Sequence, residues 1–184
     1  MSDIICEPKI TFIIPTIGRS TLSKALQSLI AMNNPNWRAI VMFDGIEPTI
    51  SSSDFRISIK KMEKKGKLNY AGEVRNKAIK ETQTEWVGFL DDDDALEPTY
   101  VDLLHDHIEK INPEIVIFRM KNSLTNIVLP PLDAKDFELN FVGISFCLKR
   151  KLVIEEGFFF EPSRIEDYNL LNRLRRCDKK IFKC

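Results

Sequence analysis

Residues 10–45, ITFIIPTIGRSTLSKALQSLIAMNNPNWRAIVMFDG, join two apolar runs through a segment with helical spacing. The first run, residues 10–14, is β-rich and nearly continuous, which is typical of a strand covered on both faces, and it stops at Pro15. Ser20 or Thr21 can cap the helix that follows. The second run, residues 37–43, ends at Asp44. This stretch predicts a β-α-β unit, in which the two strands lie parallel and the crossover is right-handed.

The same alternation continues through the rest of the sequence. Further strands are expected at residues 55–59, 86–90, 114–118 and 140–148, and further helices at 71–81, 98–110 and 166–176. Residues 121–137 contain Pro130 and Pro131 and are expected to form mostly loop. Strands that alternate with helices predict an α/β fold with a Rossmann-like, mostly parallel central sheet and helices on both faces. Because no repeat or low-complexity linker divides the sequence, residues 1–184 are expected to form a single domain.

The composition argues against several classes of protein. Lys and Arg total 27 and Asp and Glu total 27, so the formal net charge is +0 and nucleic acid is not an expected partner. The four cysteines form no C-x-x-C pair, which argues against a zinc site and favours a reducing compartment. The sequence opens without an apolar leader, and no run approaches the roughly 18 apolar residues of a membrane span. We therefore expect a cytoplasmic protein with no membrane span.

Three of the predicted strands are followed by polar side chains. Thr16 follows the first strand, Asp44 follows the second, and four aspartates, residues 91–94, follow the strand expected at 86–90. In an open α/β sheet, ligands bind beyond the carboxyl ends of the strands. If these strands are parallel neighbours, the three groups share one edge of the sheet, and that edge is the expected site.

The aspartate run concentrates negative charge at this edge. In an extended chain, residues two apart face the same side, so Asp91 and Asp93 are expected to face one point and Asp92 to face away. Two carboxylates about 4 Å apart repel by about 4 kcal/mol at an effective dielectric constant near 20, so a cation should lie between them. Mg²⁺ and Mn²⁺ prefer such oxygen ligands. The alternative is that residues 94–97 cap the next helix, which would account for one or two of the carboxylates.

Two further charged side chains are expected to face inward. Arg75 falls on the apolar side of the helix expected at 71–81, so it needs an anionic partner, either the aspartate run or a bound phosphate. Asp167 shares the apolar face of the helix expected at 166–176, whereas Glu166 is expected to point away. Asp167 is either the N-cap of that helix or a partly desolvated general base.

Three stretches together resemble glycosyltransferase family 2, which has the GT-A fold. They are ITFIIPTIGR (residues 10–19), AGEVRNKAIKETQTEWVGFLDDDDALEPTYVDLL (71–104) and VGISFCLKRKLVIEEGFFFEPSRIEDYNLLNRL (142–174). The resemblance implies an inverting enzyme that moves a sugar from a nucleotide-sugar, usually a UDP-sugar, to a hydroxyl of a glycan, glycoprotein or glycolipid. It also implies a Mn²⁺ or Mg²⁺ cofactor.

The resemblance assigns roles to residues at matching positions. Asp44 would bind the base, Arg75 would lie near the diphosphate, and Asp167 would be the catalytic base. Asp91 and Asp93 correspond to the D-x-D pair that holds the metal, with Asp93 as the direct ligand. The residues expected to contact the nucleotide-sugar are Pro15, Thr16, Arg19, Asp44, Arg75, Asp91, Asp92 and Asp94.

The sequence departs from the family in two places. Asp44 is followed by GIEPT, where many relatives carry a second aspartate and a serine, and no histidine follows His107 to serve as a further metal ligand. Residues 1–184 include none of the extensions and membrane helices of processive relatives, so transfer of one sugar per encounter is expected; an isolated domain of a longer polypeptide would look the same. Two rival functions remain open. One is a phosphohydrolase of the haloacid dehalogenase type, which also uses D-x-D after a strand, and the other is a catalytically silent domain that binds nucleotide-sugars.

Overall fold

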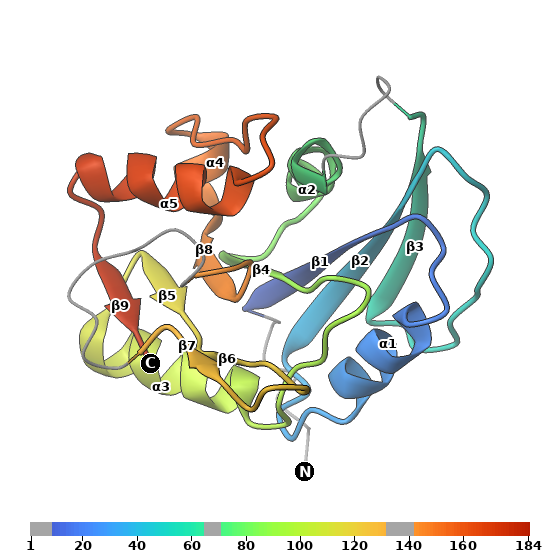
Figure 1. Cartoon of the computed structure of the whole chain (residues 1–184), viewed down its shortest axis with the longest axis horizontal. Coiled ribbons are helices and arrows are strands. Elements are labelled where there is room, and N and C mark those ends of the chain that lie inside the picture. The colour runs from blue at the N-terminus through green and yellow to red at the C-terminus, as the bar shows by residue number, and fades with distance from the viewer. Residues whose placement is uncertain (1–8, 65–70, 132–141) are drawn as a thin grey trace, which may run out of the picture.

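The computed structural model describes residues 9–64, 71–131 and 142–184, and a seven-stranded sheet runs through its centre (Figure 1). Only β8 runs antiparallel to its neighbours, which are β4 and β5. The expected mostly parallel sheet is therefore confirmed. The strands, in the order in which they lie side by side, are β3 (Ile57–Met62), β2 (Trp37–Asp44), β1 (Ile10–Thr16), β4 (Trp86–Phe89), β8 (Phe146–Lys149), β5 (Ile115–Ile117) and β9 (Ile181–Lys183).

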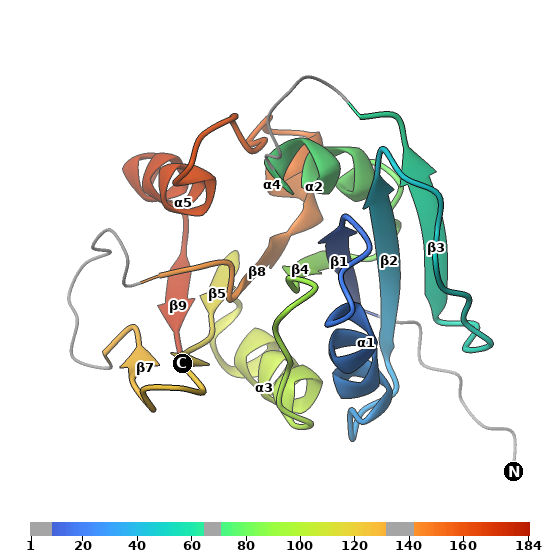
Figure 2. The same cartoon turned by 45° about the vertical axis from the view of Figure 1, so that its right-hand side comes forward.

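Helices cover both faces of this sheet, as the two views in Figures 1 and 2 show. One face packs against α1 (Leu22–Ile30) and α3 (Tyr100–Ile111), and the other packs against α2 (Ala71–Ile79), α4 (Arg150–Ile154) and α5 (Glu166–Arg176). Each face has its own hydrophobic core, because alternate side chains of each strand point to opposite sides. Among the described residues, no helix is both long enough and apolar enough to cross a lipid bilayer.

Most of the expected elements are present, with shifted ends. The strand expected at 55–59 is β3, Ile57–Met62, and the one expected at 140–148 is β8, which begins at Phe146. Residues 140 and 141 lie outside the described part. Three features were not expected: α4, β9, and a hairpin formed by β6 (Met120–Lys121) and β7 (Val128–Leu129). Each of these elements has five residues or fewer, too few to display a periodic pattern.

The strand β1 holds the centre of the parallel half of the sheet. It pairs with β2 from Ile10 to Thr16 but with β4 only from Ile10 to Ile13. Pro15, expected to end the strand, therefore lies inside it, at a position where β2 is its only strand neighbour and a missing N–H can be tolerated. The carboxyl ends of β1, β2 and β4 consequently meet at one edge of the sheet.

Candidate functional site

A small cavity of about 150 Å³ opens at the carboxyl edge of β1 and β2. Buried Thr16 and Asp44 reach it from the ends of these two strands, and α2 closes it from one side. The structure thus brings together residues from four distant stretches of sequence, three of which contribute polar side chains. The lining residues are Pro15, Thr16, Ile17, Arg19, Asp44, Ala71, Val74, Asp91 and Asp92.

The aspartate run turns back on itself after β4. The backbone N–H of Asp94 donates to the carbonyl oxygen of Asp91 at 3.1 Å. As a result, carboxylate oxygens of Asp91, Asp93 and Asp94 all lie within 4.8 Å of one another. The expectation that Asp91 and Asp93 face one point is therefore confirmed, although the run forms a turn rather than an extended chain, and this turn adds Asp94 to the cluster. The capping alternative is wrong, because α3 begins at Tyr100, after the N-cap residue Thr99.

Asp92 faces away from this cluster, as expected, and anchors the loop after β1. Its buried carboxylate accepts a hydrogen bond from Thr16 Oγ1 at 2.6 Å and another from Arg19 Nη1 at 3.1 Å. The same Arg19 nitrogen also donates to Asp93 Oδ2 at 3.0 Å. Thr16 and Arg19 thus connect the end of β1 and the loop after it to the loop after β4. These contacts fix one wall of the cavity.

The three clustered carboxylates have the chemistry of a site for a hard divalent cation. Mg²⁺ and Mn²⁺ take carboxylate oxygens and leave places for water and substrate phosphates. Burial, together with the charges of Asp91 and Asp93, raises the pKa of Asp94 to about 6. Such a cluster is electrostatically unfavourable until a cation or protons compensate it. Asp91, Asp93 and Asp94 therefore fit the metal that the sequence leads one to expect.

Arg75 links this cluster to α5. Its guanidinium is only 3% exposed and donates to Asp91 Oδ1 and to Glu166 Oε1, each at 2.6 Å. A third carboxylate oxygen, Oδ1 of Asp167, lies 3.5 Å from Arg75 Nη1. The expectation that an inward-facing Arg75 needs anionic partners is confirmed. The buried guanidinium of Arg75 thus holds together carboxylates from the loop after β4 and from α5.

The prediction that Glu166 points away from the core is wrong. Glu166 is buried at 8% exposure and makes the shorter of the two α5 contacts with Arg75. The residue lies four positions before Leu170, on the same stripe of the helix, so this spacing could have revealed its direction. The N-cap alternative for Asp167 is also wrong, since α5 has Ile165 as its N-cap and Asp167 lies in its first turn.

Burial dominates the electrostatics of both α5 carboxyls. It raises the pKa of Glu166 to about 7, with Arg75 acting in the opposite direction and Asp167 adding to the rise. It also raises the pKa of Asp167, again against the opposing effect of Arg75. A carboxyl with a raised pKa accepts a proton more readily at neutral pH than an ordinary one. Asp167 is therefore chemically suited to act as a general base.

Gly72 makes room for Glu166. A Cβ atom at this position would lie 2.5 Å from Glu166 Oε2 and 2.8 Å from Phe160 Cβ, closer than real Cβ contacts allow. Only glycine therefore lets α2 approach α5 closely enough for the pair between Arg75 and Glu166 to form.

The sequence of this chain matches the model of the family described as "Glycosyl transferase family 2" over residues 11–160. The chain belongs to glycosyl transferase family 2. The resemblance noted from the sequence is thereby confirmed, and with it membership of a family of glycosyltransferases. No match was found among curated protein sequences.

Solved structures show the same fold. TarS 1–349 of S. aureus in complex with UDP-GlcNAc has a TM-score of 0.75 and 16% identity, with 96% of this chain and 56% of that chain covered. Mannosyltransferase PcManGT of Pyrobaculum calidifontis in complex with GDP-Man and Mn²⁺ has a TM-score of 0.70 and 14% identity, with 98% and 55% covered. The GT-A fold expected for this family 2 member is confirmed. The chain spans just over half the length of these structures.

Proposed function

We propose that this family 2 member transfers one sugar per encounter from a UDP-sugar to an acceptor hydroxyl, with inversion at the anomeric carbon and with help from a divalent cation. One observation carries the proposal. Arg75 joins a carboxylate cluster suited to a cation, Asp91 with Asp93 and Asp94, to a carboxylate of raised pKa, Asp167. Leaving-group stabilisation and proton removal, the two requirements of glycosyl transfer, thus have candidate groups in one place.

The nucleotide would bind in the cavity at the ends of β1 and β2. Asp44 lines it, and no described residue donates a hydrogen bond to its carboxylate, so the carboxylate is free to accept one from a base N–H. Pro15 and Thr16 would lie against the nucleoside. Uracil is the first choice because TarS is described with UDP-GlcNAc and with UDP, and guanine is the second because PcManGT is described with GDP-Man.

The diphosphate would lie beside the aspartate cluster. Asp93 is the favoured direct metal ligand, with Asp91 and Asp94 as further ligands. A bound Mn²⁺ or Mg²⁺ would supply charge neutralisation to the departing diphosphate. Arg75 orients Asp91 through the 2.6 Å hydrogen bond, and Arg19 restrains Asp93. These contacts set the cluster in position before substrate arrives, which favours catalysis because no reorganisation is then needed.

Asp167 would remove the proton from the acceptor hydroxyl. The acceptor oxygen then forms a bond to the anomeric carbon while the bond from that carbon to the diphosphate oxygen breaks, and the nucleoside diphosphate leaves with the electron pair. A single displacement of this kind inverts the configuration. The raised pKa of Asp167 and its fixed place in the first turn of α5 support this role.

The experiment that tests the proposal needs no knowledge of the acceptor. The protein is incubated with UDP-glucose, UDP-galactose, UDP-N-acetylglucosamine or GDP-mannose, with Mn²⁺ or with a chelator, and the released nucleoside diphosphate is measured. We expect Mn²⁺-dependent hydrolysis of at least one UDP-sugar, and much less in the Asp93→Asn variant. Tight UDP binding without hydrolysis or transfer would favour the catalytically silent domain instead. Release of phosphate from simple phosphoesters would favour the phosphohydrolase, which the family match does not support.

A further inference from the structure

The segment between α4 and α5, residues 155–165, contains no helix or strand, yet it leads directly to the first turn of α5. Phe160 anchors this segment in the core, because its side chain is buried and the residue is only 3% exposed. The ring of Phe160 packs edge-on against that of Phe89 in β4, with centroids 5.2 Å apart. The position of Phe160 therefore sets the point from which the chain reaches α5 and Asp167.

The side-chain amide of Asn76, on α2, holds the backbone of Phe160 at two points. Asn76 Nδ2 donates to the carbonyl oxygen of Phe160 at 2.8 Å, and the N–H of Phe160 donates to Asn76 Oδ1 at 2.9 Å. Residues of two antiparallel strands exchange hydrogen bonds in the same way, but here one partner is a side chain. The pair needs an amide, because an ionised carboxylate can only accept hydrogen bonds.

Asn76 directly follows Arg75, so neighbouring residues of α2 hold two successive parts of the chain. Arg75 donates to Glu166 at 2.6 Å and lies 3.5 Å from Asp167, both in the first turn of α5. The Arg75 guanidinium also lies 5.4 Å from the centre of the Phe160 ring. Two attachments fix both the position and the direction of the start of α5, whereas a single ion pair would let the helix turn about that contact.

We propose that Asn76 is a positioning residue, which acts on sugar transfer through Asp167. Asn76 does not line the cavity at the ends of β1 and β2, and both polar atoms of its amide bond to Phe160. By holding Phe160, it keeps the carboxylate of Asp167 in place relative to the aspartate cluster. A displacement of about 1 Å can cost about 10²-fold in rate, so a residue that touches no substrate can control kcat. This inference rests on the proposed function, because it concerns the base of the same reaction.

The test replaces Asn76 in two ways and follows Mn²⁺-dependent hydrolysis of the donor identified in the screen, in which water takes the place of the acceptor. Asn76→Asp keeps the shape of the side chain but places a carboxylate oxygen against the Phe160 carbonyl oxygen, and Asn76→Ala removes both hydrogen bonds without adding charge. We expect kcat to fall about tenfold or more in Asn76→Asp and about threefold or more in Asn76→Ala. The KM for the donor should stay within about twofold of the parental value, because the nucleotide cavity is unchanged.

A double-mutant cycle shows whether Asn76 acts through Asp167. In the Asp167→Asn background, Asn76→Asp should change the residual rate by less than about twofold, because the base that Asn76 positions is already absent. A general loss of folded protein would instead lower the rate by the same factor in both backgrounds.

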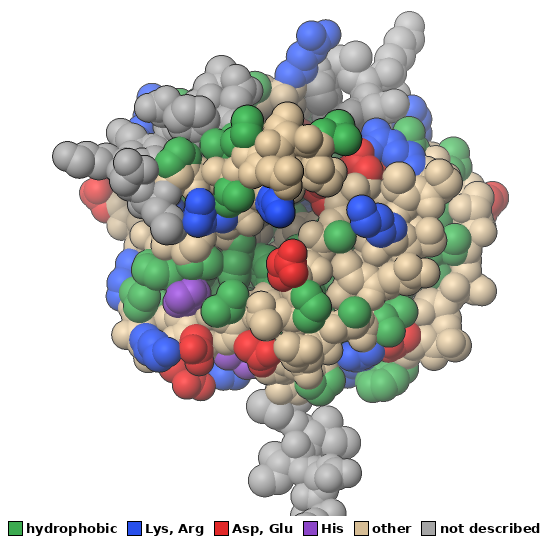
Figure 3. All heavy atoms as spheres, turned by 60° about the horizontal axis from the view of Figure 1, so that its bottom comes forward, with side chains coloured by type: hydrophobic (Ala, Val, Ile, Leu, Met, Phe, Trp, Pro, Cys, Tyr) green, Lys and Arg blue, Asp and Glu red, His purple; other side chains and the backbone are tan. Residues whose placement is uncertain are grey.

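Asn34→Asp is the matched control. Asn34 is half-buried, as Asn76 is, and its amide also makes two hydrogen bonds: it accepts from the N–H of Asn36 at 3.0 Å and donates to Asp102 Oδ1 at 2.9 Å. Asn34 follows α1 and Asp102 lies on α3, helices on the side of the molecule that Figure 3 brings forward, where acidic and basic side chains are interspersed. Asn34→Asp should leave kcat within about twofold of the parental value, because it alters only a contact remote from α5.

The outcomes separate this inference from the proposed function. Parental kcat in both Asn76 variants, equal losses in Asn76→Asp and Asn34→Asp, or the same loss in both backgrounds of the cycle would overturn the inference, while donor hydrolysis by the parent kept the proposed function intact. A rise in KM that accounts for the whole loss would also overturn it. If circular dichroism shows that Asn76→Asp does not fold, the same cycle with Asn76→Ala decides. Absence of hydrolysis by the parent with every donor would instead overturn the proposed function, and the inference with it.

Discussion

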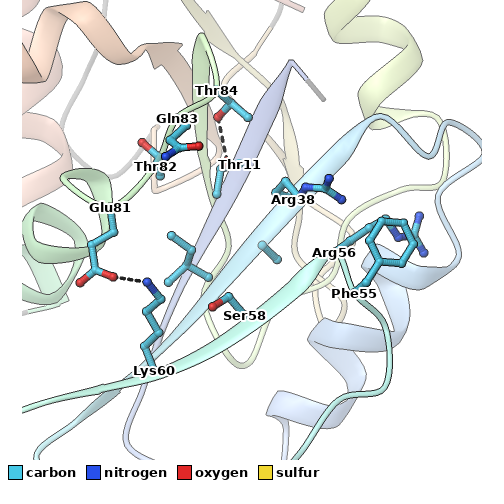
Figure 4. A pocket seen from close by; sticks show the side chains of 12 residues that line it. Thr11, Arg38, Phe55, Arg56, Ser58, Lys60, Glu81, Thr82, Gln83 and Thr84 are labelled. Carbon is cyan, nitrogen blue, oxygen red and sulfur yellow. Dashed lines mark hydrogen bonds and ion pairs between the residues drawn. The ribbon is translucent and has the colours of Figure 1, made fainter. Parts of the chain in front are cut away.

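The two edges of the parallel half of the sheet carry cavities of very different size. At the amino edge, beside the starts of β1, β2 and β3, lies a cavity of about 670 Å³, shown in Figure 4. At the carboxyl edge the cavity between β1, β2 and α2 has only about 150 Å³. Both are lined by charged and hydroxyl-bearing side chains. Size alone would therefore point to the amino edge.

The charges distinguish the two edges. At the amino edge Lys60 pairs with Glu81, and Arg56 pairs with Asp54 at 2.6 Å while stacking over Trp37. Arg38, which lies over the ring of Phe55, is the excess cation among the charged residues of this cavity. At the carboxyl edge, carboxylates outnumber the two arginines, Arg19 and Arg75, that contact them. A surplus of one sign of charge, placed where parallel strands end, indicates a site for a ligand of the opposite sign. Charge balance is thus more informative than volume here.

Among the substitutions that test this comparison, Asp167→Asn should have the largest effect. Asp167→Asn should lower the rate of sugar transfer about 10²–10⁴-fold, because an amide cannot take the acceptor proton. Stabilisation of the variant by UDP with Mn²⁺ should stay close to that of the parent. At the amino edge the corresponding change, Glu81→Gln, should alter the rate less than about twofold, since it removes only partly exposed ion pairs. Transfer at the parental rate by Asp167→Asn would remove this residue from the mechanism.

Asp93→Asn should have the next largest effect. Loss of one carboxylate from the cluster should lower Mn²⁺-dependent turnover by about 10²-fold. It should also remove most of the Mn²⁺-dependent part of the increase in Tm produced by UDP. Asp54→Asn, the same chemical change at the amino edge, should retain that increase in full. If both variants responded alike in thermal-shift assays, the assignment of the metal to the carboxyl edge would be wrong.

The order of the main strands and helices and the location of the candidate site were predictable, because both depend on hydrophobic patterns that extend over many residues. The helix expected at 166–176 has those bounds in the structure, and residues at the carboxyl ends of β1, β2 and β4 meet at one edge as parallel strands require. The hairpin of β6 and β7 was missed because two-residue strands show no periodicity. The contact between Gly72 and Glu166 was missed because it joins residues 94 positions apart in the sequence, a separation at which local spacing carries no information.

Gly72→Ala should destabilise the carboxyl edge directly. Because its Cβ would lie 2.5 Å from Glu166 Oε2 and 2.8 Å from Phe160 Cβ, overpacking should lower the free energy of unfolding by about 1–3 kcal/mol. Gly143→Ala is the matched control: its Cβ would meet only the sulfur of Met120, at 3.2 Å, which ends a flexible side chain. Urea unfolding of both variants measures the difference. Equal stabilities would show that α2 and α5 can separate at little cost.

The smallest predicted effects concern the pH dependence of the free energy of unfolding, which should differ between variants at the two edges. Because the pKa of Glu166 is raised from 4.5 to about 7, the folded state binds more protons than the unfolded chain between these values, and the free energy of unfolding should fall as pH rises through this window. In Glu166→Gln the fall should be smaller, while the raised pKa of Asp167 keeps a slope of the same sign. At the amino edge the hydrogen bond from Arg56 lowers the pKa of Asp54 below its ordinary value of 3.8. The stability that this hydrogen bond contributes is therefore present above that pH and is lost only in stronger acid. Asp54→Asn should therefore change the stability curve below about pH 4 and leave its slope between pH 5 and 7 as in the parent. Urea unfolding curves from pH 3 to 8 check both variants, and a flatter slope between pH 5 and 7 in Asp54→Asn, or an unchanged one in Glu166→Gln, would contradict the assignment of the buried carboxyls to the carboxyl edge.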